Sequence, residues 1–339
     1  MTLDFGTLDF GTLGFGAAAI GNLYRAIAEN DAQSVIEQAW AAGLRYFDTA
    51  PHYGFGLSEK RLGAALADLD PGATAIISTK VGRRLDATPD ADLSQVRQGF
   101  LSPEPYESRF DYSYDAVMRS WEASRVRLRR DHIDILYVHD IGRFAHGDAH
   151  PARMREFLDG GFRAMQELRA CGAVRAIGLG VNETAVCEEI LAHADIDLIL
   201  LAGRYTLLEQ APLDGLLPLC AARGVRIILG GPYNSGILAQ GVRHGGPVHY
   251  DYGAPPAAIV DRVRRIEEQC DRFGVALAAA ALQFPIAHPV VASVIPGIGS
   301  TAHLHSAITH MAQPIPAAFW DALRQEGVID RRAPVPTGR

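Results

Sequence analysis

One unit recurs along this chain, and it limits the folds that the chain can adopt. The unit is an amphipathic helical segment, a glycine and a short apolar run, as in "VIEQAWAAGLRYFD", "FRAMQELRACGAVRAIGLG" and "LLPLCAARGVRIILGG". Gly43, Gly172 and Gly224 stand where a helix would end in a left-handed cap, and the runs after them are typical of strands buried on both faces. Repeated units of this kind predict an α/β protein with a parallel sheet.

Further apolar runs of the same character cover residues 74–82, 133–140, 196–205 and 290–297, which makes seven predicted strands. Helices separate them, and one, over residues 258–273, repeats apolar residues at a four-three spacing. The eighth strand that a barrel needs is placed near 308–314, where the pattern is less marked. Because no Pro/Ser-rich linker or charge run divides the chain, we expect a (β/α)8 TIM barrel over residues 1–339 as a single domain, not a doubly wound sheet.

The two ends of the chain carry less regular patterns. "LDFGTLDFGTLGFG", residues 3–16, repeats DFGTL, and its glycine-punctuated short strands predict an N-terminal β-hairpin within residues 1–16. Residues 330–339 are expected to form a C-terminal tail. The amino terminus has no basic region followed by an apolar run, and no apolar stretch reaches membrane-spanning length, so we expect a cytoplasmic protein.

The charge balance restricts the partners. A formal net charge of -7 argues against nucleic acid and against an anionic membrane surface, both of which usually need a basic face. A small molecule is the expected partner, and the sequence does not indicate the oligomeric state. The cysteines, Cys171, Cys187, Cys220 and Cys270, are widely spaced and form no C-x-x-C pair, so we interpret them as buried apolar residues in a reducing compartment.

In a barrel the chemistry lies at the carboxyl ends of the strands, so the polar residues that end the apolar runs are the candidates. Lys80 is distinctive because this chain has 32 Lys plus Arg but its only lysines are Lys60 and Lys80. A compact ammonium has a pKa that shifts readily, which suits proton chemistry, although a strand-end lysine can also simply extend to solvent. His139 could equally be a core histidine, and Asp48 a turn cap. The strand-end candidates are Asp48, Lys80, His139, Asp140, Asn182 and Arg204.

Several motifs resemble the aldo-keto reductase superfamily in their order and spacing: "FDTAPHYGFG", "SEKRLG", "STKVG", "DILYVHD" and "GLGVN". The resemblance covers nearly the whole chain. "LAGRYTLLEQ" and "GGPYNSGIL" are similar to the bacterial branch that contains D-threo-aldose 1-dehydrogenases, which act on L-fucose, D-arabinose and L-galactose, and pyridoxal 4-dehydrogenases. The resemblance implies a nicotinamide-dependent dehydrogenase that oxidises an aldose at C1 to the lactone. Pyridoxal oxidation and a nucleotide-binding regulatory subunit are the alternatives.

The family's catalytic tetrad falls on Asp48, Tyr53, Lys80 and His139. By resemblance, Tyr53 transfers the proton while a hydride moves, and Lys80 lowers its pKa as a neighbouring cation. Asp48 would hold Lys80 by an ion pair, and His139 would hydrogen-bond the substrate oxygen. The residues that we expect to line the substrate site are His52, Asp140 and Tyr24.

The resemblance also implies a set of cofactor contacts. Asn182 is expected to bind the carboxamide, although it could instead cap the helix that follows. Two positions depart from the wider family, because Ala202 replaces a glutamine and Gly230 replaces a stacking tyrosine. The remaining expected contacts are Gly16, Ala17, Pro232, Asn234, Ile295, Gly297, Ser300, Thr301 and His303.

The choice of nucleotide is expected to depend on "VIPGIGSTAHLHSAI", residues 294–308, which follows a late strand and precedes a helix. Enzymes that bind the 2'-phosphate of NADP usually provide Arg or Lys, and this stretch has neither. His303 is its best cation, and histidine is largely neutral at pH 7. We therefore expect NAD to be preferred, with NADP possible if a distant arginine such as Arg324 or Arg331 reaches the site.

Three other enzyme classes fit less well. A Rossmann dehydrogenase needs G-x-G-x-x-G, but "GFGAAAIG" has Ala19 and "GLGVNE" has Glu183 at the third glycine. A metal-dependent hydrolase could use His303 and His305, but residues two apart do not share a helix face, so no metal is expected. A Schiff-base aldolase could use Lys80, but it would leave Tyr53 without a role.

Overall fold

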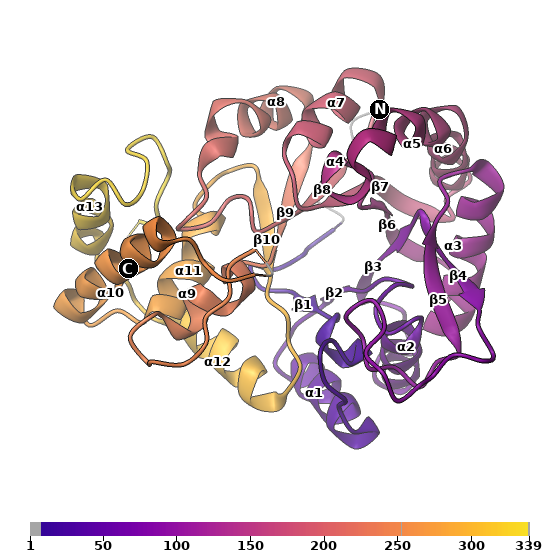
Figure 1. The fold of residues 1–339 in the computed structure, drawn as a ribbon, viewed down its shortest axis with the longest axis horizontal. Coiled ribbons are helices and arrows are strands. Elements are labelled where there is room, and N and C mark those ends of the chain that lie inside the picture. Colours follow the sequence, from indigo (N-terminus) through magenta and orange to yellow (C-terminus); the bar gives the residue numbers. More distant parts are fainter. Residues whose placement is uncertain (1–7, 252, 338–339) are drawn as a thin grey trace.

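The computed structural model of the chain describes residues 8–251 and 253–337. Eight parallel strands form a nearly closed barrel, with helices around it (Figure 1). In this sheet the strand order is β1-β2-β3-β6-β7-β8-β9-β10, which is the order expected when each strand joins its predecessor through a helical crossover. The strands are β1 (Phe15–Gly16), β2 (Tyr46–Asp48), β3 (Ile76–Val81), β6 (Ile133–His139), β7 (Val174–Val181), β8 (Leu198–Ala202), β9 (Arg226–Gly230) and β10 (Val291–Ile295).

The TIM barrel and its seven predicted strands are confirmed, but the eighth strand lies elsewhere. Residues 308–314 were expected to close the barrel, and most of them belong to a helix. Closure comes from β1, which pairs with β2 on one side. On its other side, Gly14 N donates to Val294 O and Gly16 N donates to Pro296 O, both at 3.0 Å. A Cβ on Gly16 would lie 2.7 Å from Pro296 O, so this close approach requires glycine.

The predicted N-terminal hairpin needs a correction. Residues 1–7 lie outside the described part of the chain. Of the remainder, residues 8–11 form no strand, and residues 15–16 belong to the barrel as a parallel strand. Leu8 and Phe10 pack on the inward-facing side chains of the barrel, with the ring centroid of Phe10 lying 5.1 Å from that of Tyr46. The segment therefore covers the end of the barrel at which β2 begins.

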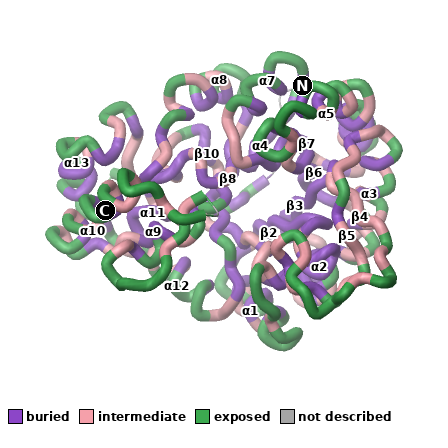
Figure 2. The backbone as a smooth tube through the Cα atoms, viewed as in Figure 1, coloured by how far each residue is buried: buried purple, intermediate pink, exposed green. Residues whose placement is uncertain are grey.

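The helices form the outer layer, and the main apolar core lies between them and the strands (Figure 2). The helix predicted over 258–273 is confirmed as α10. No helix in the described ranges is both long enough and apolar enough to cross a membrane. The helices are α1 (Glu29–Ala41), α2 (Leu57–Leu69), α3 (Tyr114–Leu128), α4 (Arg143–His146), α5 (His150–Glu156), α6 (Phe162–Ala170), α7 (Ala185–His193), α8 (Leu216–Arg223), α9 (Ile237–Gln240), α10 (Ala257–Phe273), α11 (Leu277–Ile286), α12 (Thr301–Ala312) and α13 (Ala317–Gln325).

An antiparallel hairpin interrupts the regular alternation between β3 and α3. It consists of β4 (Arg83–Ala87) and β5 (Tyr106–Phe110), and it lies beside α3 at the edge of the barrel (Figure 1). No sequence pattern predicted this hairpin. Another difference concerns the cysteines, because Cys171 is exposed whereas Cys187, Cys220 and Cys270 are buried as expected.

Candidate active site

A buried ion pair joins the ends of the neighbouring strands β2 and β3. Lys80 Nζ lies 2.7 Å from Asp48 Oδ2 and donates to Thr49 O at 2.8 Å, while Ser78 Oγ donates to Asp48 Oδ1 at 2.7 Å. Burial opposes the charge on Lys80, but its neighbours Asp48 and Tyr53 outweigh that effect and hold the pKa of Lys80 above its ordinary value. Lys80 is therefore a charged ammonium in a dry environment, and the alternative of a lysine extended to solvent is wrong.

The turn after β2 places Tyr53 against this ammonium. Lys80 Nζ lies 4.6 Å from the centroid of the Tyr53 ring. The turn is tightly packed, because Gly54 has φ 66° and a Cβ there would lie 2.3 Å from Gly21 O. Burial raises the pKa of Tyr53, and Lys80 opposes the rise without cancelling it. The expected net lowering of the pKa of Tyr53 is thus not found in the protein alone. Burial destabilises the phenolate more than the neighbouring Lys80 ammonium stabilises it.

Two neutral imidazoles lie beside Tyr53. The ring centroid of His139 lies 5.9 Å from that of Tyr53 and 5.9 Å from that of His52. Burial lowers the pKa of His52 to about 2 and that of His139 well below its ordinary value, and the cations Arg83 and Lys80 lower both further. Both side chains are therefore uncharged at neutral pH, and each can donate one hydrogen bond and accept another.

Arg83 is a cation of this site that was not among the residues predicted from the sequence. It is the first residue of β4, and its Nη1 donates to Asp140 Oδ2 at 2.9 Å while its Nε donates to Ser108 Oγ at 3.2 Å. Ser108, from β5, is hydrogen-bonded in turn to His52 Nδ1 at 3.0 Å. The available signal was the position of Arg83, three residues beyond Lys80, but a β hairpin that carries this side chain into the cavity could not be foreseen from that position.

These side chains line one cavity of about 350 Å³ at the carboxyl ends of the strands. The three predicted substrate residues all lie in its wall, with Tyr24 largely exposed at 63% and His52 and Asp140 deeper. Of the predicted tetrad, Asp48 alone does not reach the wall and contacts it through Lys80. The other lining residues are Ala18, Leu23, Tyr53, Lys80, Arg83, Gln98, Gly99, Phe100, His139, Phe144, Gly180, Val181, Asn182, Leu200 and Ala202.

A second pocket of about 410 Å³ adjoins the same loop and contains part of the predicted cofactor set. Ser300 and Thr301 lie in its wall at the N-terminus of α12, where Ser300 Oγ accepts from His303 N at 3.2 Å. Tyr24 lines the first cavity and the next residue, Arg25, lines the second, so one loop borders both. An elongated molecule with an anionic middle, such as a dinucleotide, fits this arrangement because a helix N-terminus attracts anions.

Several further predicted contacts are also open to a ligand. Asn182 follows β7 in the wall of the cavity, and its side-chain amide makes no hydrogen bond within the described residues. It does not cap α7, whose N-cap is Thr184. Gly297 is exposed, and no atom lies within 4 Å of a Cβ built on it. His303 is exposed on α12, with its side chain open to solvent.

Other predicted contacts are already engaged or covered. Asn234 accepts from Thr206 Oγ1 at 2.6 Å and donates to Gly203 O at 3.0 Å, so its amide holds two loops together. The Ile295 side chain packs into the interior of the barrel. Arg204 donates to Asn182 O at 2.6 Å and pairs with Asp251, outside the wall of the cavity. Gly16 ends β1 and Ala17 follows it, while Gly230 ends β9 and Pro232 lies two residues further on. None of these four residues lines either of the two cavities.

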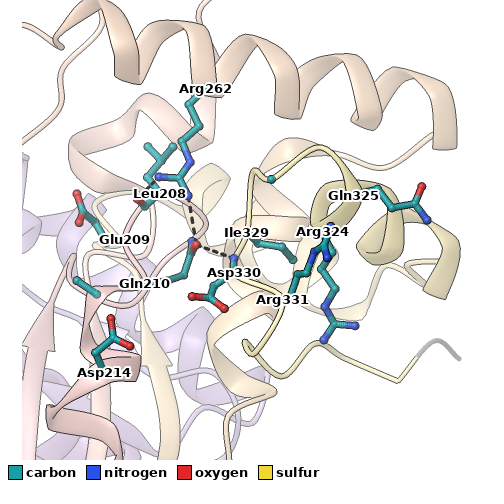
Figure 3. A pocket seen from close by; sticks show the side chains of 12 residues that line it. Leu208, Glu209, Gln210, Asp214, Arg262, Arg324, Gln325, Ile329, Asp330 and Arg331 are labelled. Carbon is teal, nitrogen blue, oxygen red and sulfur yellow. Dashed lines mark hydrogen bonds between the residues drawn. The ribbon is translucent and has the colours of Figure 1, made fainter.

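The distant arginines do not approach α12. Arg324 and Arg331 line a separate hollow of about 550 Å³, together with Glu209, Gln210 and Asp330 (Figure 3). In that hollow Gln210 Oε1 accepts from Arg262 and from Asp330 N, both at 3.2 Å. The pocket beside Ser300 instead contains Arg25 as its cation, with Asp31 nearby. No group of three or more His, Cys, Asp or Glu side chains within residues 8–251 and 253–337 is arranged to hold a metal ion.

Known proteins are similar to this chain in sequence and in fold. The model of the aldo/keto reductase family matches residues 12–326. Pyridoxal 4-dehydrogenase of Microbacterium luteolum is 42% identical over 320 residues, and D-threo-aldose 1-dehydrogenase of a Pseudomonas species is 40% identical over 316 residues, each with 92% of both chains covered. The structure of the aldo-keto reductase AKR11C1 from Bacillus halodurans superposes with a TM-score of 0.70 at 25% identity, covering 92% of this chain and 91% of that one. The chain therefore belongs to the aldo/keto reductase family and is an NAD(P)-dependent oxidoreductase.

Proposed function

We propose that the protein oxidises an aldose of the L-fucose, D-arabinose or L-galactose type at C1 to the lactone, with NAD as the preferred hydride acceptor. The observation that carries this proposal is the wall of the 350 Å³ cavity, where His52, Arg83 and Asp140 lie next to Tyr53 and His139. A hydroxyl-rich ligand can satisfy these polar groups, and a site with buried polar groups rejects ligands that leave them unpaired. The relative named D-threo-aldose 1-dehydrogenase supports the same substrate class.

In this proposal Tyr53 accepts the proton of the C1 hydroxyl while hydride leaves the same carbon. Bound NAD supplies the hydride acceptor and a positive charge that favours the phenolate. Lys80 stabilises that phenolate from its position over the Tyr53 ring, and Asp48 keeps Lys80 in place through the 2.7 Å ion pair. His139, held neutral by burial, donates a hydrogen bond to the substrate oxygen and orients the reacting C–H bond.

The residues present fit a nicotinamide dinucleotide. Asn182 offers a side-chain amide that is free within the described residues, and it lies in the same cavity as Tyr53. The N-terminus of α12, with Ser300 and Thr301, would bind phosphate in the adjoining pocket. We therefore assign the nicotinamide end to the first cavity and the adenosine end to the second.

The preference for NAD rests on the charges near the adenosine end. The segment 295–301 contains no Lys or Arg, and the pocket beside it combines Arg25 with the carboxylate of Asp31. A 2'-phosphate carries close to two negative charges, so Asp31 would repel it, whereas a free ribose hydroxyl can donate to a carboxylate. Arg25 is exposed, and salt screens an exposed cation.

Pyridoxal oxidation is the second candidate, and the aromatic part of the cavity favours it. The Phe100 ring centroid lies 6.1 Å from that of Tyr53 with a 32° interplanar angle, and Tyr24 and Phe144 also line the wall, so a pyridine ring has partners to stack against. The relative named pyridoxal 4-dehydrogenase supports this candidate.

The deciding experiment measures kcat/KM with NAD for L-fucose, D-arabinose, L-galactose, their C2 epimers and pyridoxal. An aldose dehydrogenase should favour one aldose over its epimer by well over tenfold, because a misplaced hydroxyl leaves a buried polar group unpaired. Pyridoxal turned over far faster than every aldose would establish the second candidate. Nucleotide binding without turnover of any of these substrates would point to a regulatory subunit.

A further inference from the structure

The hairpin β4–β5 brings a second ion pair into the substrate cavity. Gly82, with φ 91°, turns the chain directly from β3 into β4, and a Cβ there would lie 2.4 Å from the Tyr112 ring. Arg83 follows at once, and its guanidinium carbon lies 4.7 Å from the centroid of the Phe110 ring on the partner strand. The guanidinium is thus held on one side by an aromatic face and cannot swing freely into solvent.

Asp140 is fixed just as firmly. It directly follows His139 and adopts φ 51°, a left-handed conformation that aspartate tolerates better than most residues. Its backbone N donates to Gly180 O at 3.0 Å, and Tyr112 Oη donates to its carbonyl at 3.1 Å. An unusual backbone conformation at the rim of a site is consistent with a functional side chain, because the surrounding contacts must maintain it.

Hydrogen-bonding capacity remains on both partners of this pair. Arg83 uses Nε and Nη1, and Asp140 accepts on Oδ2, from which His139 Nε2 lies 3.5 Å. Within the described residues, no hydrogen bond engages Arg83 Nη2 or Asp140 Oδ1. The pair therefore presents a donor and an acceptor close together in the cavity, which matches two neighbouring hydroxyl groups, one accepting and one donating.

The charges in the cavity balance locally. Lys80 is paired with Asp48 at 2.7 Å, and Arg83 with Asp140 at 2.9 Å, and both histidines are neutral. The lining residues include no other Lys or Arg. A phosphate or carboxylate group on a substrate would therefore meet a guanidinium that is already neutralised, together with the repulsion of the Asp140 carboxylate.

We propose that the Arg83–Asp140 pair determines substrate specificity, by binding two adjacent hydroxyl groups and by excluding substrates that carry a phosphate or a carboxylate. This inference rests on the proposed function, because it concerns the same cavity. It adds a substrate class that the family assignment leaves open: neutral polyhydroxylated aldehydes or lactols, and not their phosphate esters.

The test is a change of charge at constant shape. Asp140→Asn keeps the left-handed backbone, which asparagine also tolerates, but leaves Arg83 without its counter-charge. Asp86→Asn is the matched control, because Asp86 pairs with Arg84 at 3.0 Å on the same hairpin but does not line the cavity. Each variant is assayed with D-arabinose and D-arabinose 5-phosphate, and with pyridoxal and pyridoxal 5'-phosphate. Nucleotide binding and thermal midpoints confirm that the variants are folded.

For the wild-type protein we expect kcat/KM to favour the neutral member of each pair by roughly 10²-fold. In Asp140→Asn, kcat/KM for the neutral substrate should fall by about tenfold or more, and its ratio to kcat/KM for the phosphate ester should fall by at least tenfold. Asp86→Asn should behave like wild type. An equal loss on both members of a pair, or an equal shift in Asp86→Asn, would overturn the proposal.

Calorimetric titration of the NADH-bound protein with D-arabinose and its 5-phosphate measures the same preference as a ratio of Kd values, because the reduced nucleotide cannot accept hydride from the aldose. If no substrate is turned over but the Kd ratio shifts as described in Asp140→Asn, the proposed function fails and the assignment of the pair stands. If turnover occurs and both ratios stay unchanged, the function stands and the assignment of the pair fails.

Discussion

Replacing Lys80 by methionine tests the electrostatic role that the structure gives to this residue. The substitution keeps most of the volume of the side chain and removes the charge that lies 4.6 Å from the centroid of the Tyr53 ring. At an effective dielectric constant near 20, unit charges about 4.6 Å apart interact by about 3.6 kcal/mol, so an ammonium this close is strong enough to shift the pKa of Tyr53 measurably.

Part of this change is offset by Asp48. Burial already raises the pKa of Asp48, and Lys80 at 2.7 Å is the main opposing influence. Without Lys80 the pKa of this carboxyl rises further, and any loss of its negative charge favours the Tyr53 phenolate. We therefore expect the pKa of Tyr53 to rise in Lys80→Met, but by less than the loss of the ammonium alone would cause.

The sign of the pH effect depends on the direction of the reaction. Oxidation needs the deprotonated hydroxyl, so its rate falls on the acid side of the pKa of Tyr53, whereas carbonyl reduction needs the protonated form and falls on the alkaline side. Both limbs should move to higher pH in Lys80→Met. The assay is kcat/KM against pH in both directions, with Lys60→Met as the control, because Lys60 is exposed and pairs with Glu104 away from the cavity. A folded, nucleotide-binding Lys80→Met with both limbs in their wild-type positions would refute the reasoning.

Three shorter predictions follow from other contacts. Tyr53→Phe should lower kcat by roughly 10²-fold or more with nucleotide affinity retained, and near-normal turnover would remove Tyr53 from the mechanism. Glu59→Gln should lower the free energy of unfolding by about 3 kcal/mol, because it leaves the Arg127 guanidinium, 2.6 Å away, without its counter-charge. In the same denaturant titration Glu122→Gln, at an exposed residue, should change the free energy of unfolding by less than about 0.5 kcal/mol. Arg25→Ala should weaken NADP binding by up to about fivefold with little effect on NAD, and an equal loss for both nucleotides in fluorescence titrations would place Arg25 on their shared pyrophosphate.

The barrel was predictable because its strands are marked by a local and repeated signal. A helix, a capping glycine and an apolar run identify β2, β7 and β9 from sequence alone, and continuous apolar runs identify β3, β6, β8 and β10. β1 carries no such signal. It has two residues, and Gly14 and Gly16 are required by close approaches to Ile295, the last residue of β10, and to Pro296, which follows it; both are distant in the sequence. Such a strand is specified by tertiary contacts and not by its own propensity.

The residues of the candidate site also fall into those that the sequence predicts and those that it does not. Asp48, Lys80 and His139 were found because each stands at the end of a strand, so the barrel alone brings them together. Their catalytic roles stay predictions. Arg83 and Arg25 were missed because a hairpin and a loop carry them, and the placement of such segments depends on long-range packing.

The two ion pairs of the site differ in what their loss should change. Asp48–Lys80 is buried to within a few per cent and acts on Tyr53, so its disruption should move the pH dependence and lower kcat for every substrate alike. Asp140–Arg83 retains 24% and 16% side-chain exposure and faces the cavity, so its disruption should change the ratio between substrates. His139 and His52 lie beside both pairs, and because they are neutral they weaken neither by charge. The Asp48–Lys80 pair therefore serves the chemistry, and the Asp140–Arg83 pair can change with the substrate. The latter is possible because Arg83 belongs to the hairpin and Asp140 is a single residue after β6, so neither belongs to the tetrad.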